Sequence, residues 1–401
     1  MRTPLEHLSF VLEGITPLPL VELPLASTNG LVLGENVAAR WPLPSFANSA
    51  MDGYAVRSID VAQATPDRPV ELRVIEDIPA GSWPKEQLIP GTAARIMTGA
   101  PVPAGADGIV RVEHTDGGMP IVVVSSPAGN DIRQIGEDIA EGQQVLSAGT
   151  VMGPRTIGLA AAAGRGSLHV HSRPHVFLLS TGSELVQPGH ALQPGQISDV
   201  NGVMLETALA GLDVSVSRSN IVNDDPNVMS AALMAAAQSA DLIVTTGGVS
   251  MGAYDTVKSV LSSMGTVTFE RVAMQPGMPQ GSGRVAGTPI VTLPGNPVSA
   301  FVSMEVFVRP VIRRLQGHEV DWKTSGSLRI AESFRSPLGK VQFVRAQIDK
   351  VRDAARPIGV QGSHILGGLA LADCLLIVPA ETEEVLAGDT LEFLDLRRDS
   401  R

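Results

Sequence analysis

The feature that most restricts the fold is an alternation of apolar runs and helix-forming segments between residues 174 and 314. The runs HVFLLSTG, DVSVSRSNIV and DLIVTTGG are typical of strands, and NGVMLETALAG and PNVMSAALMAAAQSA between them are typical of helices. Strands that alternate with helices indicate right-handed βαβ units around a parallel sheet. We therefore expect an α/β domain with a mostly parallel sheet and flanking helices.

The rest of the chain has a different pattern. Residues 5–15 carry apolar side chains at helical spacing and are followed by Pro17 and Pro19, which predicts a short amphipathic helix. Residues 21–146 and 317–401 consist of short apolar runs cut by glycine and proline, which predicts β-rich domains, the last of them small. The length of 401 residues fits about two to four domains better than one core.

Charge and cysteine content exclude several classes of protein. The net charge of −11 argues against nucleic-acid binding, because affinity for a phosphate backbone is built from clustered Lys and Arg. The single cysteine, Cys374, excludes an intrachain disulfide, and its setting in ADCLLIVP predicts a buried structural thiol. With no secretion signal and no apolar run of the ~18 residues that a membrane span needs, we expect a cytoplasmic protein without a membrane partner.

Two glycine-rich turns follow predicted strands of the α/β region. One is STGSEL at residues 180–185, and the other is GGVSMG at residues 247–252, before a helix expected at 256–264. Glycines let backbone N–H groups approach an anion closely, and a helix N-terminus adds a favourable dipole. Both turns would lie at the carboxyl edge of the sheet and face one cleft, although glycine can also serve turn geometry alone.

A third turn, LPGNPVSA, joins a predicted strand to a helix that starts near Val298. Its prolines fix φ, so the turn is either a preorganised binding loop or a rigid structural connection. Carboxylates flank these turns and would suit a bridging divalent cation such as Mg²⁺. They are Glu184, Asp199, Asp224, Asp225 and Asp255. Asp224 or Asp225 could equally cap the helix that begins at Pro226.

The N-terminal half offers further candidates. Asp52 in SAMDGYA is either a turn residue or a site residue, and RIMTGAPVPAGAD, with Arg95 and Thr98 on a strand, is a binding loop or a barrel corner. Arg133 and Asp138 could form a surface ion pair of little energetic weight. His169 and His171 would share a strand face, and without a third ligand we interpret them as structural.

Taken together, these segments resemble the molybdopterin molybdotransferases, which are the bacterial MoeA proteins and the matching domain of gephyrin. The motifs occur in family order from about residue 5 to the C-terminus. They are NSAMDGYAVR, RIMTGAPVPAGAD, IRQIGEDIAEG, STGSELVQPG, GQISDVNG, TTGGVSMGAYD, LPGNPVSA and GSHILGGLALADC.

The resemblance implies a homodimer of four-domain subunits with an active site shared between subunits. The expected domains are a linker or dimerisation domain (1–46 with 139–172), a β-rich insertion (47–138), the molybdopterin-binding α/β domain (173–316) and a C-terminal β domain (317–401). The implied reaction inserts molybdate into adenylylated molybdopterin and releases AMP with the help of Mg²⁺. An upstream molybdopterin adenylyltransferase is a plausible partner.

Site residues follow from the matching motifs. The implied catalytic residues are Asp52, Thr98, Arg133, Asp138, Glu184 and Asp255, with Glu184 and Asp255 as metal ligands. The implied substrate-binding residues are Ser180, Thr181, Gly182, Asp199, Asp224, Gly247, Gly248, Ser250, Arg271, Pro294, Gly295, Asn296 and Pro297. The hypothesis is that carboxylates hold the cation and orient molybdate while the glycine-rich turns hold the pterin phosphate.

The chain departs from the family where many relatives have a KPGKP turn. It has Gln275 and Met278 in place of the two lysines, and Arg271 keeps a positive charge nearby. Ser183 and Ala47 stand where acidic residues are common. Fewer cations would weaken anion attraction, which affects the expected rate and the preference between molybdate and tungstate.

Two alternatives follow. The first is a scaffold or carrier that binds molybdopterin without turnover, as the loss of the lysines would allow. The second is a nicotinamide-nucleotide amidohydrolase built on the same α/β domain. The SAMDGYA and RIMTGAP segments argue against the second, because they belong to flanking domains that such an enzyme would lack.

Overall fold

The computed structural model describes residues 1–219, 225–249, 256–264, 267–320, 322, 324–349, 351 and 354–397. These residues form two compact units. Unit 1 contains residues 1–21, 30–34 and 170–401, and unit 2 contains residues 22–29 and 35–169. The chain passes between the units along β1 (Leu20–Pro24) and β11 (Ser167–His171), which pair with each other.

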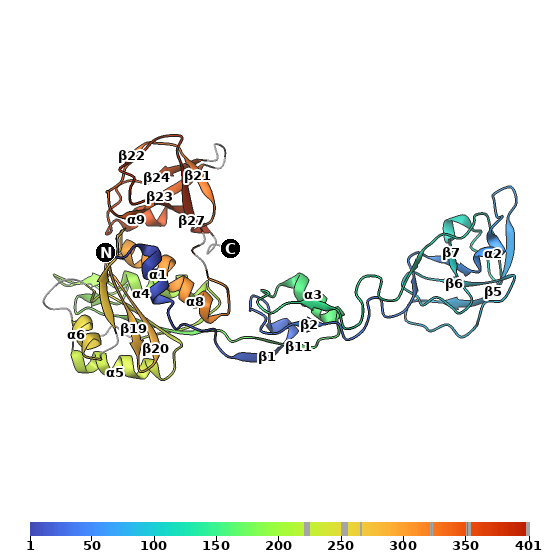
Figure 1. Ribbon diagram of the computed structural model, residues 1–401, viewed down its shortest axis with the longest axis horizontal. Helices are drawn as coiled ribbons and strands as arrows, with labels where there is room; N and C mark the ends of the chain where they lie inside the picture. Colours follow the sequence, from blue (N-terminus) through green and yellow to red (C-terminus); the bar gives the residue numbers. More distant parts are fainter. Residues whose placement is uncertain are drawn as a thin grey trace. The chain divides into compact units, whose positions relative to one another are not determined.

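A six-stranded sheet forms the centre of unit 1 (Figure 1). Its order is β15-β12-β16-β20-β19-β17; the first four strands are parallel, and β19 is antiparallel to both of its neighbours, β20 and β17. The strands are β12 (His175–Ser180), β15 (Ser215–Arg218), β16 (Leu242–Thr246), β17 (Thr268–Arg271), β19 (Pro279–Val285) and β20 (Thr288–Leu293). The expected mostly parallel sheet is confirmed.

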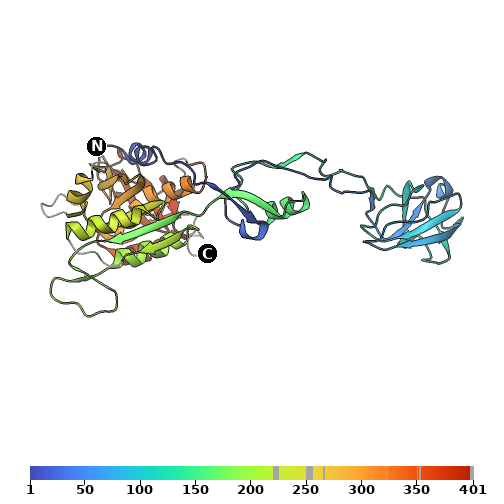
Figure 2. The same ribbon diagram turned by 90° about the horizontal axis from the view of Figure 1, so that it is seen from below.

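Helices cover both faces of this sheet because alternate strand residues point to opposite sides. On β16, Leu242 and Val244 pack with α1, α4 and the helices of residues 297–315, whereas Ile243 packs with α5 and α6. Figures 1 and 2 both show α1, in dark blue, beside the orange helices of residues 297–315. The helices are α1 (Pro4–Val11), α4 (Val200–Ala210), α5 (Pro226–Ala237), α6 (Thr256–Ser263), α7 (Pro297–Ser303), the π-helical η3 (Met304–Val308) and α8 (Arg309–Leu315).

The first helix is shorter than expected. It begins after Thr3, whose side chain accepts from the Glu6 amide in a capping box. It ends at Val11 rather than at Ile15, because the chain turns through Gly14 at a φ of +67°. Ile15 is nevertheless buried with Val11 in the core of the α/β domain.

The C-terminal part of unit 1 is a small barrel. Five strands close in the order β23-β24-β21-β27-β25, since β25 also pairs with β23, and β18 adds to β23 at the side. Alternate residues of β25 face the barrel interior (Cys374, Leu376) and the α/β domain (Leu375, Ile377). The elements are β18 (Met274–Gln275), β21 (Ser327–Ile330), β22 (Phe334–Arg335), β23 (Val341–Asp349), β24 (Ala354–Pro357), α9 (Leu366–Ala370), β25 (Cys374–Val378), β26 (Glu384–Val385) and β27 (Thr390–Asp395).

Unit 2 is rich in β structure, as expected. A five-stranded sheet in the order β7-β4-β6-β5-β8 has apolar side chains on both faces, with Tyr54 and Val110 on one and Ala55 and Ile109 on the other. Its elements are β4 (Gly53–Val56), α2 (Ser58–Val61), β5 (Val70–Ile78), β6 (Thr92–Ile96), β7 (Gly108–Arg111) and β8 (Ile121–Val124). The smaller elements are η1 (Leu25–Ser27), β2 (Val37–Ala38), β3 (Asn48–Ser49), η2 (Val112–His114), β9 (Ile132–Arg133), β10 (Gln144–Leu146) and α3 (Pro154–Ala162).

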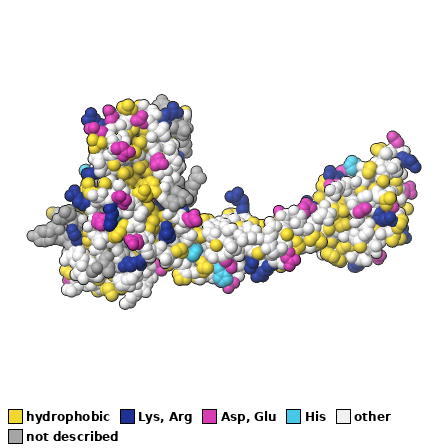
Figure 3. All heavy atoms as spheres, viewed as in Figure 1, with side chains coloured by type: hydrophobic (Ala, Val, Ile, Leu, Met, Phe, Trp, Pro, Cys, Tyr) yellow, Lys and Arg dark blue, Asp and Glu magenta, His cyan; other side chains and the backbone are white. Residues whose placement is uncertain are grey.

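The surface gives no sign of a strongly charged binding face in the view of Figure 3. Side chains of both signs are interspersed there. Among the helices of the described residues, none combines the length and apolar character that crossing a bilayer requires. The two compact units are a coarser division than the four domains expected from the sequence, and that finer division stays a prediction.

Candidate functional site

Three loops leave the sheet of unit 1 side by side. The strands β12, β16 and β20 are parallel neighbours, with Ser180 opposite Thr246 and Thr246 opposite Leu293. The loops that follow them begin at Thr181, Gly247 and Pro294. The prediction that the glycine-rich turns share the carboxyl edge of the sheet is therefore confirmed.

These loops contact one another closely. The Thr181 amide donates to the carbonyl of Thr246 at 3.3 Å, and the Gly247 amide donates to the carbonyl of Leu293 at 3.1 Å. Gly247 has a φ of +90°, and a Cβ there would lie 2.8 Å from the carbonyl oxygen of Thr181. Gly248 follows with a φ of +74°. Only glycine fits both the conformation and the space at residue 247, so the three loops form one preorganised edge.

The N-terminal turn of α4 lies beside two of these loops. Asp199 caps the helix, since its Oδ1 accepts from the Gly202 amide at 2.8 Å. Asn201 donates from Nδ2 to the carbonyl of Gly295 at 2.7 Å. A Cβ at Gly202 would lie 2.8 Å from the Ser180 hydroxyl, so this turn also touches the loop after β12.

Several polar atoms at this edge are buried without a hydrogen-bond partner among the described residues. They are Oγ of Ser180, Oδ2 of Asp199 and Oδ1 of Asn201. Ser180 is 0% exposed and Asp199 is 1% exposed. Buried polar groups in proteins are nearly always satisfied, so atoms of this kind indicate a place where a ligand or ordered water completes the site.

The glycine-rich turn after β12 also shapes the position of Glu184. Gly182 has a φ of +147°, and a Cβ at that residue would lie 2.7 Å from a carboxylate oxygen of Glu184. Glu184 is exposed, and its backbone carbonyl accepts from the Ile197 amide at 2.9 Å. The predicted residues Thr181, Gly182 and Glu184 therefore lie on one tight turn.

The LPGNP turn is held from two sides. Asn201 binds Gly295, as described, and Asn296 donates from Nδ2 to the Ser363 hydroxyl at 3.1 Å. The Val298 amide donates to the carbonyl of Ser363 at 3.2 Å. Pro297 is the first residue of α7, where a missing N–H costs nothing. Sequence analysis did not single out Ser363 from within its GSHILGG motif, because no local spacing links it to the turn.

The turn that lacks the family lysines has Arg271 close to it. Gln275 lies at the end of β18, and Arg271 lies at the end of β17 with an exposed side chain. The Arg271 Nε donates to the sulfur of Met278 at 3.2 Å. A thioether is a weak acceptor, so this contact does not neutralise the positive charge of Arg271.

Unit 2 brings Asp52 and Thr98 together. Asp52 precedes β4 and Thr98 follows β6, and these strands are antiparallel neighbours. The Thr98 amide and hydroxyl both donate to Oδ1 of Asp52, at 2.6 and 2.8 Å. These two hydrogen bonds lower the pKa of Asp52 below its ordinary value. Thr98 lies beyond the strand rather than on it, since β6 ends at Ile96.

Arg133 and Asp138 do not form the expected pair. Both side chains are exposed, and no ion pair joins them in the described part of the chain. Arg133 lies on β9, paired with Asn48 of β3, while the Asp138 amide donates to the carbonyl of Leu43 at 3.0 Å. The residues that bracket the RQIGE turn are thus tied to different parts of the backbone.

Some expected site residues lie outside the described residues, namely Asp224, Ser250 and Asp255. Asp225 is described, and its side chain accepts from the amides of Asn227 and Val228, so the capping alternative holds for it. No group of three potential metal ligands occurs among the residues that the structure describes. The described residues alone therefore do not form a cation site around Glu184.

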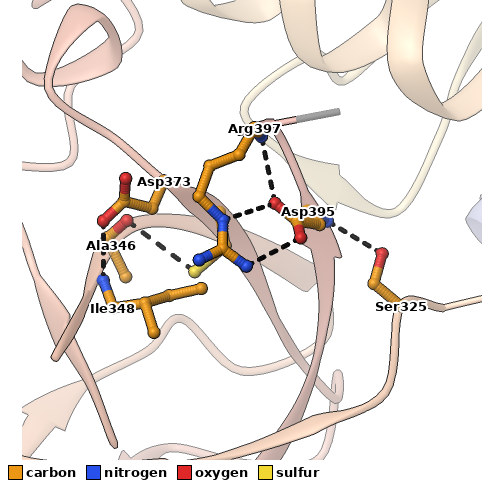
Figure 4. Close-up of polar contacts among 7 residues, drawn as sticks. Ser325, Ala346, Ile348, Asp373, Asp395 and Arg397 are labelled. Carbon is orange, nitrogen blue, oxygen red and sulfur yellow. Dashed lines mark hydrogen bonds and ion pairs between the residues drawn. The ribbon is translucent and has the colours of Figure 1, made fainter. Parts of the chain in front are cut away.

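Cys374 and the paired histidines have structural environments. Burial raises the pKa of Cys374 to about 12, and its sulfur lies 3.7 Å from the carbonyl oxygen of Ala346. Figure 4 shows the adjacent contact between Asp395 and Arg397. Nδ1 of His169 lies 3.2 Å from a Glu35 oxygen, and Nδ1 of His171 lies 2.8 Å from the carbonyl oxygen of Leu18. The structural interpretations are consistent with these contacts.

Comparison with known protein families accounts for nearly the whole chain. Residues 3–164 match the MoeA N-terminal region (domain I and II), and residues 327–396 match the MoeA C-terminal region (domain IV). Residues 177–314, which hold the three loops, match a probable molybdopterin binding domain.

Individual relatives agree with this assignment. Molybdopterin molybdenumtransferase 2 of Mycobacterium tuberculosis is 48% identical over 99% of this chain and 100% of its own. The Haemophilus influenzae molybdopterin molybdenumtransferase is 34% identical over 90% of each chain. A crystal structure of the molybdopterin biosynthesis MoeA protein from Pyrococcus horikoshii superposes with a TM-score of 0.85 at 30% identity, covering 98% of this chain and 99% of that one. The chain therefore belongs to the MoeA family.

Proposed function

We propose that this chain is a molybdopterin molybdenumtransferase that inserts molybdate into adenylylated molybdopterin, releases AMP and so contributes to molybdenum cofactor biosynthesis. Membership of the MoeA family and the names of its relatives support this reaction. The observation that carries the proposal in the structure is the contact of the three loops around Thr181, Gly247 and Gly295, beside buried oxygens that make no hydrogen bond to the described residues.

The loops have the chemistry to hold and orient an anionic heterocycle. Gly247 and Gly248 both have positive φ, and the Gly247 amide already donates to the carbonyl of Leu293, so the Gly248 amide is the group that this part of the turn can offer to a phosphate. The side chains of Asp199 and Ser180 offer oxygens that can accept hydrogen bonds. The negative charge of the Asp199 carboxylate would repel a phosphate at this position. We therefore assign the phosphate to the glycine-rich turn after β16 and the hydrogen-bond donors of the substrate to the Ser180 and Asp199 side.

A divalent cation would supply charge neutralisation between molybdate and the phosphates. Mg²⁺ held by Glu184 and Asp255 stays a prediction, because Glu184 is the one member of this pair among the described residues. The cytoplasmic location and an upstream adenylyltransferase as partner also stay predictions.

The decisive experiment follows AMP. Purified protein is incubated with adenylylated molybdopterin, Mg²⁺ and molybdate, and AMP release is measured by chromatography against a control without protein. The transferase releases AMP only when molybdate is present. Tight pterin binding without AMP above the control would instead support the non-catalytic scaffold, which the replacement of lysines by Gln275 and Met278 motivates. Omission of Mg²⁺ with added chelator tests the cation.

A matched pair of variants tests the role of Glu184. Glu184→Gln removes the charge on the turn after β12 and is expected to lower turnover strongly while pterin binding persists. Glu332→Gln removes a charge from an exposed side chain of the C-terminal barrel and should leave turnover unchanged. Equal activity of the two variants would contradict the role assigned to Glu184.

The family resemblance also implies a homodimer in which Asp52 and Thr98 serve the active site of the partner subunit. Mixing inactive Glu184→Gln and Asp52→Asn proteins, with subunit exchange, should then restore roughly a quarter of wild-type activity, because half of the dimers gain one intact site. If each chain completed its own site, the mixture would stay inactive. Size-exclusion chromatography with light scattering gives the oligomeric state independently.

The missing lysines give a test of anion binding. Reintroducing them as Gln275→Lys and Met278→Lys should increase affinity for molybdate and make it more sensitive to salt, since the two lysines would add positive charge beside Arg271, which contacts Met278. Arg271→Gln should have the opposite effect. Isothermal titration with molybdate and with tungstate measures both affinities and their ratio.

A further inference from the structure

The buried carboxylate of Asp199, beside the three loops, has an arginine partner that no sequence motif predicted. Asp199 is 1% exposed, and its Oδ2 makes no hydrogen bond in the described structure. The nearest cation is Arg218, whose NH2 group lies 3.5 Å from that oxygen. This contact is an ion pair rather than a hydrogen bond, and it compensates a charge whose burial would otherwise be costly.

Arg218 also contacts the middle of α4. It is the last residue of β15, and its NH1 group donates to Oε2 of Glu206 at 2.9 Å. Asp199 and Glu206 are seven residues apart, two turns along the same helix face. One guanidinium thus links the start and the middle of α4 to the edge strand of the sheet, and its side chain is only 14% exposed.

The turn that Arg218 anchors contacts two of the three loops. Gly202 lies against the Ser180 hydroxyl after β12, and Asn201 holds the carbonyl of Gly295 in the LPGNP turn. A shift of Asp199 would release the Gly202 amide that it caps. The path from Arg218 to the loops therefore consists of direct contacts between neighbouring groups, each of which can be removed separately.

We propose that Arg218 is a positioning residue for the proposed molybdopterin site, because it holds the Asp199 carboxylate and the first turn of α4 against Ser180 and Gly295. This inference rests on the proposed function for its ligand. Arg218 itself is assigned no contact with the substrate. Its effect passes through Asp199, so the guanidinium is needed for affinity and not for the chemical step.

The test measures the Kd of molybdopterin and the KM and kcat for adenylylated molybdopterin. Arg218→Gln should raise Kd and KM about tenfold with little change in kcat, an effect typical of residues that couple through a shared partner. Arg218→Lys keeps a cation that can reach Asp199 but loses the planar group that also contacts Glu206, so it should restore part of the affinity that Arg218→Gln loses. Arg173→Gln is the matched control, because it breaks an exposed 2.7 Å ion pair with Asp213 in the same unit. It should leave Kd unchanged.

A double-mutant cycle shows whether Arg218 acts through Asp199. In an Asp199→Asn background, Arg218→Gln should change Kd by less than about twofold, whereas in a Glu206→Gln background it should keep its tenfold effect. An unchanged Kd for Arg218→Gln, or a tenfold effect that persists in the Asp199→Asn background, would overturn the proposal.

A measurement on the protein without ligand tests this inference separately from the proposed function. Amide hydrogen exchange at Gly202 reports the Asp199 cap directly and needs no substrate. Arg218→Gln should speed exchange at Gly202 about tenfold, while Arg173→Gln should not. If wild-type protein fails to bind molybdopterin, the proposed function is wrong, and the exchange data still decide whether Arg218 positions α4. Equal exchange rates in both variants would exclude that role.

Discussion

Replacement of Gly202 tests how closely the first turn of α4 packs against Asp199 and Ser180. An alanine Cβ at this position would lie 2.3 Å from Oδ2 of Asp199 and 2.8 Å from Oγ of Ser180. Real Cβ atoms do not approach oxygen this closely, so the Asp199 carboxylate must move. Its displacement removes the 2.8 Å cap on the Gly202 amide and lengthens the 3.5 Å contact with Arg218.

The expected change in the free energy of unfolding combines two destabilising effects and one stabilising effect. Loss of a helix cap costs about 0.5–2 kcal/mol. Crowding of a packed interior costs about 1–3 kcal/mol. Alanine gains about 0.8–1 kcal/mol over glycine inside a helix. Gly202→Ala should therefore reduce the free energy of unfolding of unit 1 by about 1–3 kcal/mol.

Fluorescence of Trp322 can follow unit 1 alone. The chain has three tryptophans, and Trp41 and Trp83 belong to unit 2. Guanidinium unfolding of Gly202→Ala is compared with its parent in a Trp41→Phe, Trp83→Phe background. The control is Gly367→Ala in α9, where a Cβ would meet nothing within 4 Å and should not destabilise. A Gly202→Ala protein as stable as its parent would refute the packing argument.

Three further predictions concern groups away from the loops. Burial and the charge of Arg2 lower the pKa of His7 to about 4, so at a pH between that value and the ordinary pKa of histidine the imidazole is protonated in the unfolded chain and neutral in the folded protein. The free energy of unfolding should therefore fall by about 2–4 kcal/mol as pH drops from 6.5 to 4, and His7→Leu should abolish that part of the pH dependence in denaturation curves. Because burial raises the pKa of Cys374 to about 12, a thiol reagent at pH 8 should label it only after unfolding, and rapid labelling of native protein would contradict this. Arg345 is 1% exposed and donates to the carbonyl of Val360 at 2.7 Å, so Arg345→Met should cost about 2–4 kcal/mol in thermal unfolding, whereas the exposed Arg356→Met should cost little.

Local patterns were sufficient to predict the α/β domain. Strands such as β16 are continuous apolar runs and the helices between them are long, so the alternation identifies a parallel sheet. The edge rule then places the loops after β12 and β16 together, and the structure confirms this. The antiparallel extension was not predicted, because β19 reads PQGSGRV and lacks the apolar pattern of a strand.

The residues that sequence analysis missed act through long-range contacts. Arg218 meets Asp199 only because β15 is placed next to β12, and no spacing along the chain indicates that neighbour. Asp199 was interpreted as a substrate carboxylate flanking a loop, and its capping of α4 requires knowledge of where the helix begins. Arg345 had one usable signal, a charge inside the apolar strand segment VQFVRAQID.

The position of α1 has a consequence for biosynthesis. This helix is made before unit 2, yet Leu8 and Val11 of α1 and the nearby Ile15 pack against strands and helices that lie beyond residue 170. At a synthesis rate of about 5–20 residues per second, the residues that bury α1 are made on the order of tens of seconds after α1 itself. Unit 2, between residues 22 and 169, can fold during that interval. The apolar face of α1 is therefore buried only after residues far later in the chain have been made.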